Sequence, residues 1–431
     1  MAEQITEYVC ISCGGSIRFD SASGKMKCDY CDSLYSLEEV KAYYEEENKK
    51  NANQDSSLSA ENAWGEALDS MKAYKCQACG AELVCEENTA ATSCPYCGNV
   101  AIIPQQFKDM LRPKYVIPFK IDKEEAKSKL SGYIKGKKLL PGSFTSQNHI
   151  DEIKGVYVPF WLYSGTVDAD VKYDAKQEEV KKTDTEKITT TKFYDVRRKG
   201  GASFKMIPTD ASTKMPDDLM DSIEPYNYSE IKNFEMEYLV GFLADKYDVS
   251  QEESKMRARK RAENSTLSML KDTVENYNQV DERVSERKIH FLGEKEEYAM
   301  LPVWLLTTKW NNENLLFAIN GQTGKMIGNL PIDRVKQWFF NLLIAIPLLA
   351  VGLYFGHFQK GGIIFGIVLA LIGGAITNSI NVKSMKPVSE SNSAMNYVGT
   401  DADGKKKDIK LSIKEDKYIR TTTKKEPLNK N

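Results

Sequence analysis

The chain has 431 residues, a formal net charge of −2 and 28% charged residues. Its length predicts two to four domains, and its nearly neutral charge excludes a chain-wide positive field that would attract nucleic acid. Its nine cysteines form four Cys-x-x-Cys pairs with one cysteine left over. In a reducing compartment, thiols at this spacing indicate metal ligands rather than disulfides.

The N-terminal quarter of the chain contains two predicted zinc ribbons, each built from two Cys-x-x-Cys pairs that enclose fourteen residues. Each two-residue gap lets a tight turn present two thiolates, and two such turns complete a tetrahedral site. The residues between the pairs predict a β-hairpin, which in the first ribbon turns at Ser23 and Gly24. We therefore expect two structural Zn²⁺ ions, in ribbons over residues 1–35 and 73–104. The predicted ligands are Cys10, Cys13, Cys28 and Cys31 in the first ribbon, and Cys76, Cys79, Cys94 and Cys97 in the second.

Some details of the cysteine pattern leave alternatives open. Four thiolates close the coordination shell of the metal, which favours a structural ion over a catalytic one. A rubredoxin-like iron site also uses Cys-Pro-x-Cys-Gly turns, as at Cys94, so iron is an alternative to zinc. Cys85 matches Phe19 of the first ribbon, which predicts a small core residue rather than a fifth ligand.

The surroundings of the cysteines favour contacts with protein over contacts with nucleic acid. Acidic residues outnumber basic ones in both ribbons, and each four-thiolate zinc centre adds about two negative charges. Phosphate binding needs clustered cations, which the ribbons lack. Tyr30 and Tyr96, one inside a Cys-x-x-Cys turn of each ribbon, either cover the ribbon or contact a protein partner.

Residues 36–72 are predicted to be a charged, partly helical linker. Ser36 and Glu39 form a capping-box pattern that predicts the start of a helix. A polar stretch follows, and a second short helix is expected over residues 63–73.

The middle of the chain, residues 113–331, is predicted to be a duplicated α+β cytoplasmic domain. A pattern of strand, helix, strand and strand occurs twice along it. Asp122 and Glu125 predict the start of the first helix, and Ser250 and Glu253 predict the start of the second.

Four features of the middle domain have more specific interpretations. A strand is expected over residues 238–243, and the aromatic strands around Trp161 and Trp304 are expected to form the core. The polar insertion over residues 174–191 predicts an exposed hairpin. We expect five basic residues of the second helix to lie on a solvated face, and contact with phosphate or lipid is the alternative. These residues are Lys255, Arg257, Arg259, Lys260 and Arg261.

Two apolar runs follow, over residues 338–355 and 361–380. About twenty apolar residues in a helix span the hydrocarbon core, where only a helix satisfies the backbone. We therefore expect a transmembrane helical hairpin over residues 338–380, with a buried hairpin of a soluble core as the alternative. Lys and Arg flank its outer ends, which predicts a cell-membrane protein with both termini in the cytoplasm. The N-terminal residues lack the apolar core of a signal peptide.

The basic tail, residues 381–431, carries twelve Lys and Arg against seven Asp and Glu. Contact with anionic lipid and simple solubility both explain this excess of positive charge.

Distinctive motifs of the middle domain lie at Val158–Tyr163, Ile207–Ser212, Asp217–Ser222, Pro302–Thr307 and Ala318–Lys325. Together with the paired ribbons, they resemble a bacterial family of membrane proteins with TFIIB-type zinc ribbons. The resemblance covers about residues 8–380 and implies a non-enzymatic membrane platform without catalytic residues. It also implies PspA-like and SPFH-type protein partners in the response to envelope stress.

The sequence therefore supports two hypotheses from different functional classes. The favoured hypothesis is a membrane-anchored cytoplasmic scaffold or adaptor that recruits protein partners to the membrane. The alternative is a membrane-tethered nucleic-acid-binding zinc-ribbon protein, and a metal-dependent hydrolase comes third. No nucleophile–base pair, open metal site or phosphate-binding loop is recognisable in the sequence.

Overall fold

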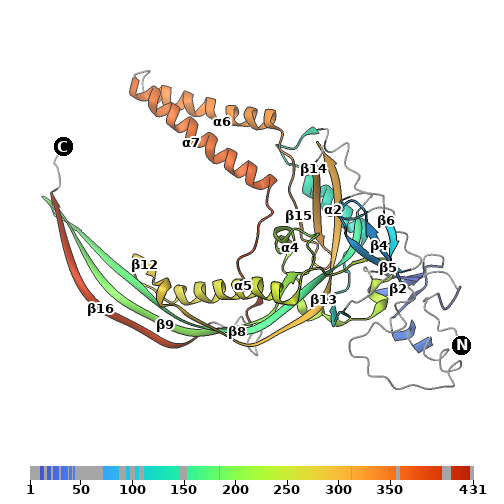
Figure 1. Cartoon of the computed structure of the whole chain (residues 1–431). Helices are drawn as coiled ribbons and strands as arrows, with labels where there is room; N and C mark the ends of the chain where they lie inside the picture. The colour runs from blue at the N-terminus through green and yellow to red at the C-terminus, as the bar shows by residue number, and fades with distance from the viewer. Residues whose placement is uncertain are drawn as a thin grey trace. The chain divides into compact units, whose positions relative to one another are not determined.

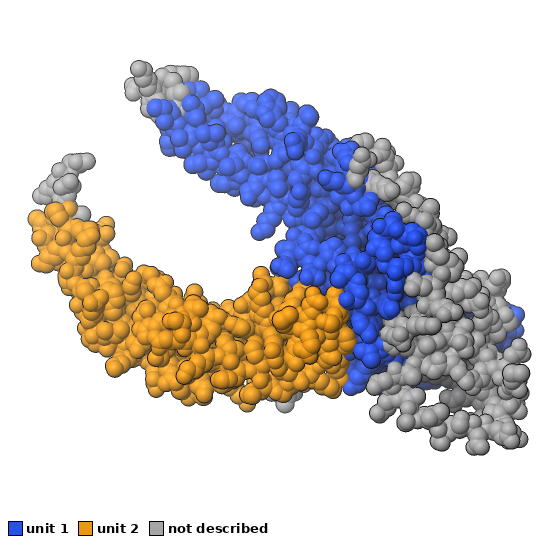
Figure 2. All heavy atoms as spheres, in the orientation of Figure 1, with its two compact units in different colours: residues 1–160, 210–248, 298–390 blue, residues 161–209, 249–297, 391–431 orange. Residues whose placement is uncertain are grey.

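The structure is a computed structural model of the chain (Figure 1). It describes residues 10–13, 17–20, 23–28, 31–36, 38–40, 42–43, 71–86, 94–97, 102–105, 111–142, 144, 153–183, 185–311, 313–355, 360–399 and 409–427. The chain divides into two compact units, coloured separately in Figure 2. Unit 1 comprises Met1–Phe160, Asp210–Asp248 and Tyr298–Glu390, and unit 2 comprises Trp161–Thr209, Val249–Glu297 and Ser391–Asn431.

Unit 1 contains a mixed β-sheet. Its strands lie in the order β10 (Lys232–Asn233), β7 (Tyr115–Val116), β13 (Lys288–Trp310), β8 (Lys154–Lys182), β11 (Leu243–Asp245), β5 (Glu82–Glu86), β4 (Met71–Cys76) and β6 (Ile102–Gln105). β7 runs parallel to β13, with Tyr115 opposite Ala299, and β11 runs parallel to β8, with Leu243 opposite Val156. β14 (Glu313–Asn320) pairs with β13, and β15 (Met326–Gly328) pairs with β14. Strands β8 and β13 also contribute residues to unit 2.

The predicted helix starts are confirmed. At the start of α2 (Lys123–Ile134), the backbone N–H of Glu125 donates to Asp122 Oδ1 at 2.7 Å. At the start of α5 (Gln251–Asp272), Glu253 N donates to Ser250 Oγ at 3.3 Å. With β9 (Glu186–Asp210), the order strand–helix–strand–strand occurs as β7–α2–β8–β9. In the second half, β12 (Gln279–Glu282) and the 3-10 helix η5 (Val284–Glu286) lie between α5 and β13, so the order there is β11–α5–β12–η5–β13–β14. The duplication stays a prediction.

Aromatic side chains fill the core of unit 1, as predicted for the strand around Trp304. The Phe119 ring stacks on Phe242 with centroids 4.1 Å apart, and it meets Tyr157 and Trp304 edge-on. All four rings are buried, and the Trp304 indole N–H donates to the carbonyl of Ile121 at 2.8 Å. Edge-on and offset aromatic pairs stabilise a core beyond the area that they bury. The other predicted core residue, Trp161, is buried in unit 2.

Unit 2 is a long antiparallel sheet with α5 packed against it. β12 (Gln279–Glu282) and β16 (Lys410–Pro427) pair with β8 and β9 respectively. Apolar side chains of β8 and β9 pack with Leu270 in the C-terminal half of α5 and with Val274 just beyond its end. The strand residues of this cluster are Ala169, Val171, Tyr173, Ala175 and Val196. The predicted hairpin over residues 174–191 is formed by the ends of β8 and β9. The basic tail therefore contributes a strand, β16, which the sequence interpretation did not include.

Arg261 corrects the prediction of a solvated basic face on α5. Its side chain is 2% exposed, and its guanidinium donates to the carbonyls of Pro208 and Ser393 and lies over the Tyr397 ring. Arg259 pairs with the carboxylate of Glu294. For Arg261 the prediction was wrong, because a charged residue at helical spacing can be buried when folded segments supply acceptors. Here the acceptors come from β9 and from the segment that precedes β16. Lys260 is exposed, and Lys255, Arg257 and Arg259 are half-buried.

Two predicted elements have different boundaries or types. Of the expected strand over residues 238–243, residues 238–239 belong to the 3-10 helix η4 (Met236–Leu239), residues 240–242 form a turn and a bend, and β11 begins at Leu243. Gly241 adopts φ +81°, a left-handed conformation that interrupts an extended strand. Of the expected helix over residues 63–73, residues 71–73 belong to β4, and the remainder lies outside the described residues. The other short elements are α4 (Asp217–Ile223), η3 (Tyr228–Glu230), η5 (Val284–Glu286) and η6 (Met395–Tyr397).

The two apolar runs form long helices, α6 (Arg334–Phe355) and α7 (Lys360–Met385). Both are long and apolar enough to cross a membrane, and only 6% of the most apolar stretch of each is buried. The helices lie side by side (Figure 1), and the position of a Cβ on Gly366 would be 3.1 Å from the Leu349 carbonyl oxygen. Close approach of helix backbones at small residues is typical of helix pairs in membranes.

The pairing of Arg198 with Asp416 should hold β16 in place. The Arg198 side chain is 1% exposed, and its guanidinium donates to the Asp416 carboxylate, the Glu415 carbonyl and the Thr273 hydroxyl. We expect Asp416→Ala to destabilise unit 2 by about 1–3 kcal/mol, because a buried cation loses its counter-charge while its other acceptors remain. Melting in detergent and hydrogen exchange of residues 410–427 would measure the loss. Glu415→Ala, which removes an exposed carboxylate next to it, is the control, and equal effects of the two changes would contradict this role.

Candidate metal centres

The first four-cysteine group lies on a ribbon of three strands, β1 (Ile17–Asp20), β2 (Lys25–Cys28) and β3 (Leu34–Tyr35). β1 and β2 form the predicted hairpin, with Ile17 opposite Cys28. At its turn, Ser23 donates from N and Oγ to Asp20 Oδ2, and Gly24 adopts φ +67°. Glycine adopts this left-handed conformation without a steric penalty. The hairpin thus carries the second cysteine pair to the first.

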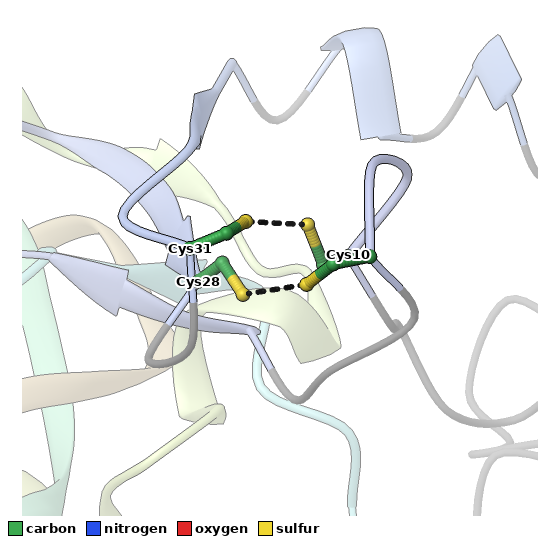
Figure 3. A group of neighbouring side chains, drawn as sticks. Cys10, Cys28 and Cys31 are labelled. Carbon is green, nitrogen blue, oxygen red and sulfur yellow. Dashed lines mark hydrogen bonds between the residues drawn. The ribbon is translucent and has the colours of Figure 1, made fainter.

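The four sulfur atoms of this first group converge, with every pair within 4.8 Å. Cys10 Sγ lies 3.5 Å from Cys31 Sγ, and Cys13 Sγ lies 3.5 Å from Cys28 Sγ. Figure 3 shows Cys10, Cys28 and Cys31 directed toward one another from the two turns. Cys10 and Cys28 are buried, whereas Cys13 and Cys31 are exposed. One side of this centre therefore faces solvent.

Polar neighbours favour thiolates in the first group. Burial raises the pKa of Cys10, but a hydrogen bond with the Tyr35 hydroxyl and bonds from backbone N–H groups outweigh it and lower that pKa to about 6. Hydrogen bonds from the side chain and backbone of Ser33 lower the pKa of Cys31. Because a metal binds the thiolate, these neighbours prepare the cysteines for a cation.

The second group has the same geometry in a more enclosed setting. Cys76 Sγ and Cys97 Sγ lie 3.6 Å apart, as do Cys79 Sγ and Cys94 Sγ. Cys76 and Cys94 are buried and the other two are half-buried. Burial raises the pKa of Cys94 and brings that of Cys79 to about 11. A bound cation would offset this cost of burying negative charge.

The second ribbon is continuous with the central sheet of unit 1. Its strand β5 pairs antiparallel with β11, with Val84 opposite Ala244. The Thr307 hydroxyl in β13 lies 2.6 Å from the Pro95 carbonyl oxygen, inside the Cys94–Cys97 turn. Lys246 donates to Glu82 in β5 at 3.1 Å. The second centre is therefore fixed by residues of the middle domain.

Both groups fit a tetrahedral metal ion. A Zn–S distance of about 2.3 Å in a tetrahedron places the sulfurs about 3.8 Å apart. In the structure two sulfur pairs in each group lie 3.5 or 3.6 Å apart, and every pair lies within 4.8 Å. The eight predicted ligands are thus brought together in two groups of four, each able to hold a metal ion. Four thiolates suit Zn²⁺, and the same donor set also suits iron. Strand β5 includes Cys85, whose side chain lies outside the described residues.

Tyr96 does not lie on an exposed partner surface. Its side chain is 7% exposed. Burial and the nearby Asp245 carboxyl raise the pKa of the Tyr96 hydroxyl, although no conventional hydrogen bond joins the two groups. Burial raises the pKa of Asp245, a residue of β11, to about 7. The burial of Tyr96 contradicts the interpretation as an exposed partner surface, and its neighbour Asp245 belongs to the middle domain. Tyr30 lies outside the described residues.

Sequence reasoning missed the residues that support the two centres. Tyr35 and Ser33 follow the Cys28–Cys31 turn closely, so a polar residue just after a cysteine pair could have suggested them. Thr307 is 212 positions from Pro95, and Asp245 comes from β11. Nothing local in the sequence marks either of these two residues.

The chain is similar in sequence to a bacterial protein whose own function is uncharacterized. It is 34% identical over 338 residues to the uncharacterized protein YdjG of Bacillus subtilis (strain 168). The aligned region covers 78% of this chain and 93% of YdjG. No family profile matches the chain, and no solved structure matches it.

Metal content should follow the two cysteine groups. We expect two zinc ions per purified chain, a loss of about one ion in Cys13→Ala or Cys94→Ala, and no change in Cys85→Ala. Elemental analysis would measure this, and a single zinc or mainly iron would contradict it. Because the second centre is continuous with the sheet, Cys94→Ala should lower the melting temperature more than Cys13→Ala does.

The buried carboxyl of Asp245 should make stability depend on pH. Its folded pKa of about 7 exceeds the unfolded value of about 3.9, so the folded state loses stability as pH rises from about 4 to 7 and stays at the lower level above that. Asp245→Asn should flatten this decline and raise the melting temperature at pH 7.5 by roughly several degrees. Melting curves between pH 5.5 and 7.5 would test this. The exposed Asp281→Asn serves as control, and an unchanged slope in Asp245→Asn would refute the assignment.

Proposed function

The chain belongs to the family of Bacillus subtilis YdjG, and from this premise we propose that it is a non-enzymatic, membrane-anchored cytoplasmic scaffold. In this proposal, two structural zinc ions hold the ribbons, and the protein recruits other proteins to the membrane. The partners proposed are PspA-like and SPFH-type proteins that act in envelope stress.

The exposed apolar surface of α6 and α7 is the observation that carries the membrane anchor. Trp338, Ile364 and Leu371 are 66%, 63% and 68% exposed, and large apolar side chains are exposed along both helices. Water would disfavour so large a contiguous apolar surface, whereas lipid chains would cover it. The Gln337 amide donates to Asn378 Oδ1 at 2.6 Å, which pairs two polar groups between the helices.

The flanking charges support an orientation with both termini in the cytoplasm. Arg334 and Lys336 begin α6, and Lys383 and Lys386 lie at and beyond the end of α7. Lys and Arg accumulate on the cytoplasmic side of membrane helices. A reducing cytoplasm also keeps the cysteine thiols available for a metal.

The first ribbon offers the more suitable surface for a protein partner. Leu34 in β3 is 46% exposed, and Tyr43 in the following helical segment is 42% exposed. β3 is the edge of its sheet, next to β2. A metal-stabilised ribbon presents such side chains rigidly without a large core, and membrane anchoring raises its local concentration. We therefore assign recruitment to the first ribbon rather than to Tyr96.

A crosslinking experiment on intact membranes tests the scaffold. Crosslinked full-length protein, purified after nuclease treatment, should retain PspA-like or SPFH-type partners. Leu34→Ser with Tyr43→Ser should reduce recovery by about tenfold, because anchoring residues at an interface contribute a large share of the affinity. Leu292→Ser with Val284→Ser, which changes exposed apolar residues of unit 2, is the matched control.

The outcomes separate the two classes of function. Zinc content and resistance to alkaline extraction from membranes should be unchanged in all variants. Retention of partners by the Leu34 and Tyr43 variant would move the docking surface to another part of the chain. Loss of all partners on nuclease treatment, with salt-sensitive retention of the wild type on DNA, would favour the nucleic-acid-binding alternative.

A further inference from the structure

Three segments that are distant in sequence meet at the base of the α6–α7 hairpin. The loop after α2 contacts the start of α6, where Asp333 N donates to the Leu139 carbonyl at 2.8 Å. The same loop contacts the end of α7, where Lys137 Nζ donates to the Ser384 carbonyl at 2.8 Å. The ends of the hairpin are joined by Leu330 N, which donates to the Met385 carbonyl at 2.8 Å.

These segments carry a concentration of positively charged residues, which we call the basal cluster. Residues 135–140, 331–338 and 381–387 contain one carboxylate, Asp333, which caps α6 by accepting from the N–H groups of Val335 and Lys336. Five of the seven cations are exposed and two, Lys137 and Lys336, are half-buried. The basal cluster consists of Lys135, Lys137, Lys138, Arg334, Lys336, Lys383 and Lys386.

The contribution of the α2 loop distinguishes this cluster from ordinary topology signals. Charges that orient a membrane helix flank it in sequence. Lys336 Nζ, in contrast, donates to the carbonyl of Leu140, 196 positions away, and Lys138 Nζ lies 5.9 Å from the centroid of the Phe340 ring. Folding of unit 1 brings these lysines to the helix base, where membrane orientation alone does not require them.

We propose that the basal cluster binds the phosphodiester headgroups of anionic phospholipids. This inference rests on the membrane anchor proposed above, because α6 and α7 would place the cluster at the surface of the cytoplasmic leaflet. Trp338, exposed one turn into α6 from Arg334, occupies the level at which aromatic side chains meet the interface. Lysines near an anionic membrane surface attract its headgroups additively, and the half-buried aliphatic stems of Lys137 and Lys336 fix the positions of two charges.

Lipid selectivity of the full-length chain tests the proposal. Protein in nonionic detergent is equilibrated with equimolar phosphatidylglycerol and phosphatidylcholine, and the bound lipids are counted by mass spectrometry. We expect wild-type protein to be enriched in phosphatidylglycerol, and Lys135→Gln/Lys137→Gln/Lys138→Gln to lower the enrichment about fivefold or more. The flanking cations that orient the helices remain in this variant.

Two matched variants control for charge and folding. The corresponding triple Arg variant keeps the charge and should retain the enrichment. Lys205→Gln/Lys260→Gln/Lys271→Gln removes three exposed lysines of unit 2 and should also retain it. Raising salt from 50 to 500 mM should weaken the enrichment of the wild type, since screening shortens the reach of exposed charges.

Each remaining outcome would overturn the proposal in a recognisable way. If the triple Gln variant keeps wild-type enrichment, or if the unit 2 control loses it, the lysines of the α2 loop are not the lipid site. A labelled DNA duplex that binds through the same three lysines, without any phosphatidylglycerol preference, would identify a nucleic-acid phosphate site instead. Release of wild-type protein by alkaline extraction would refute the membrane anchor itself, whatever the lipid counts show.

Discussion

The pairing of β5 with β11 is the contact on which the arrangement of unit 1 depends. It joins the second ribbon, by backbone hydrogen bonds, to the central sheet of unit 1, whose hydrophobic core contains Phe119 and Trp304. Backbone pairing fixes both the position and the register of a ribbon strand, because a shift by one residue would exchange its two faces. The second metal centre is therefore part of the domain core. The first, with two exposed cysteines, retains a solvent-facing side.

The α6–α7 hairpin is constrained at its base in a comparable way. Backbone hydrogen bonds tie its two ends to each other and to the loop after α2. Its apolar side chains remain exposed, so the same element combines backbone attachment to the rest of unit 1 with a surface suited to lipid. The basal cluster lies at this attachment, beside the apolar helices, where its positive charge can meet anionic headgroups.

The cysteine groups, the capped helices and the apolar helices could be read from the sequence because each depends on local spacing. Two-residue gaps between cysteines and a Ser or Asp three positions before a Glu act within one turn, and each apolar run is continuous in sequence. Burial of Arg261 and Tyr96, the role of Thr307 and the strand β16 depend on residues far along the chain. A charged helix position and a charged tail look solvated until the segments that supply their partners are placed.

The place of β16 in the chain also sets an order of events during synthesis. β8 and β9 are complete by residue 210, yet the strand that pairs with β9 follows α7. A ribosome therefore delivers Asp416 to Arg198 only after both apolar helices have left the exit tunnel. Until then, the backbone groups along the outer edge of β9 are unpaired, and Arg198 lacks the carboxylate of Asp416. Completion of unit 2 therefore requires that the hairpin has already been synthesised, and a chain truncated before residue 409 would keep an open edge at β9.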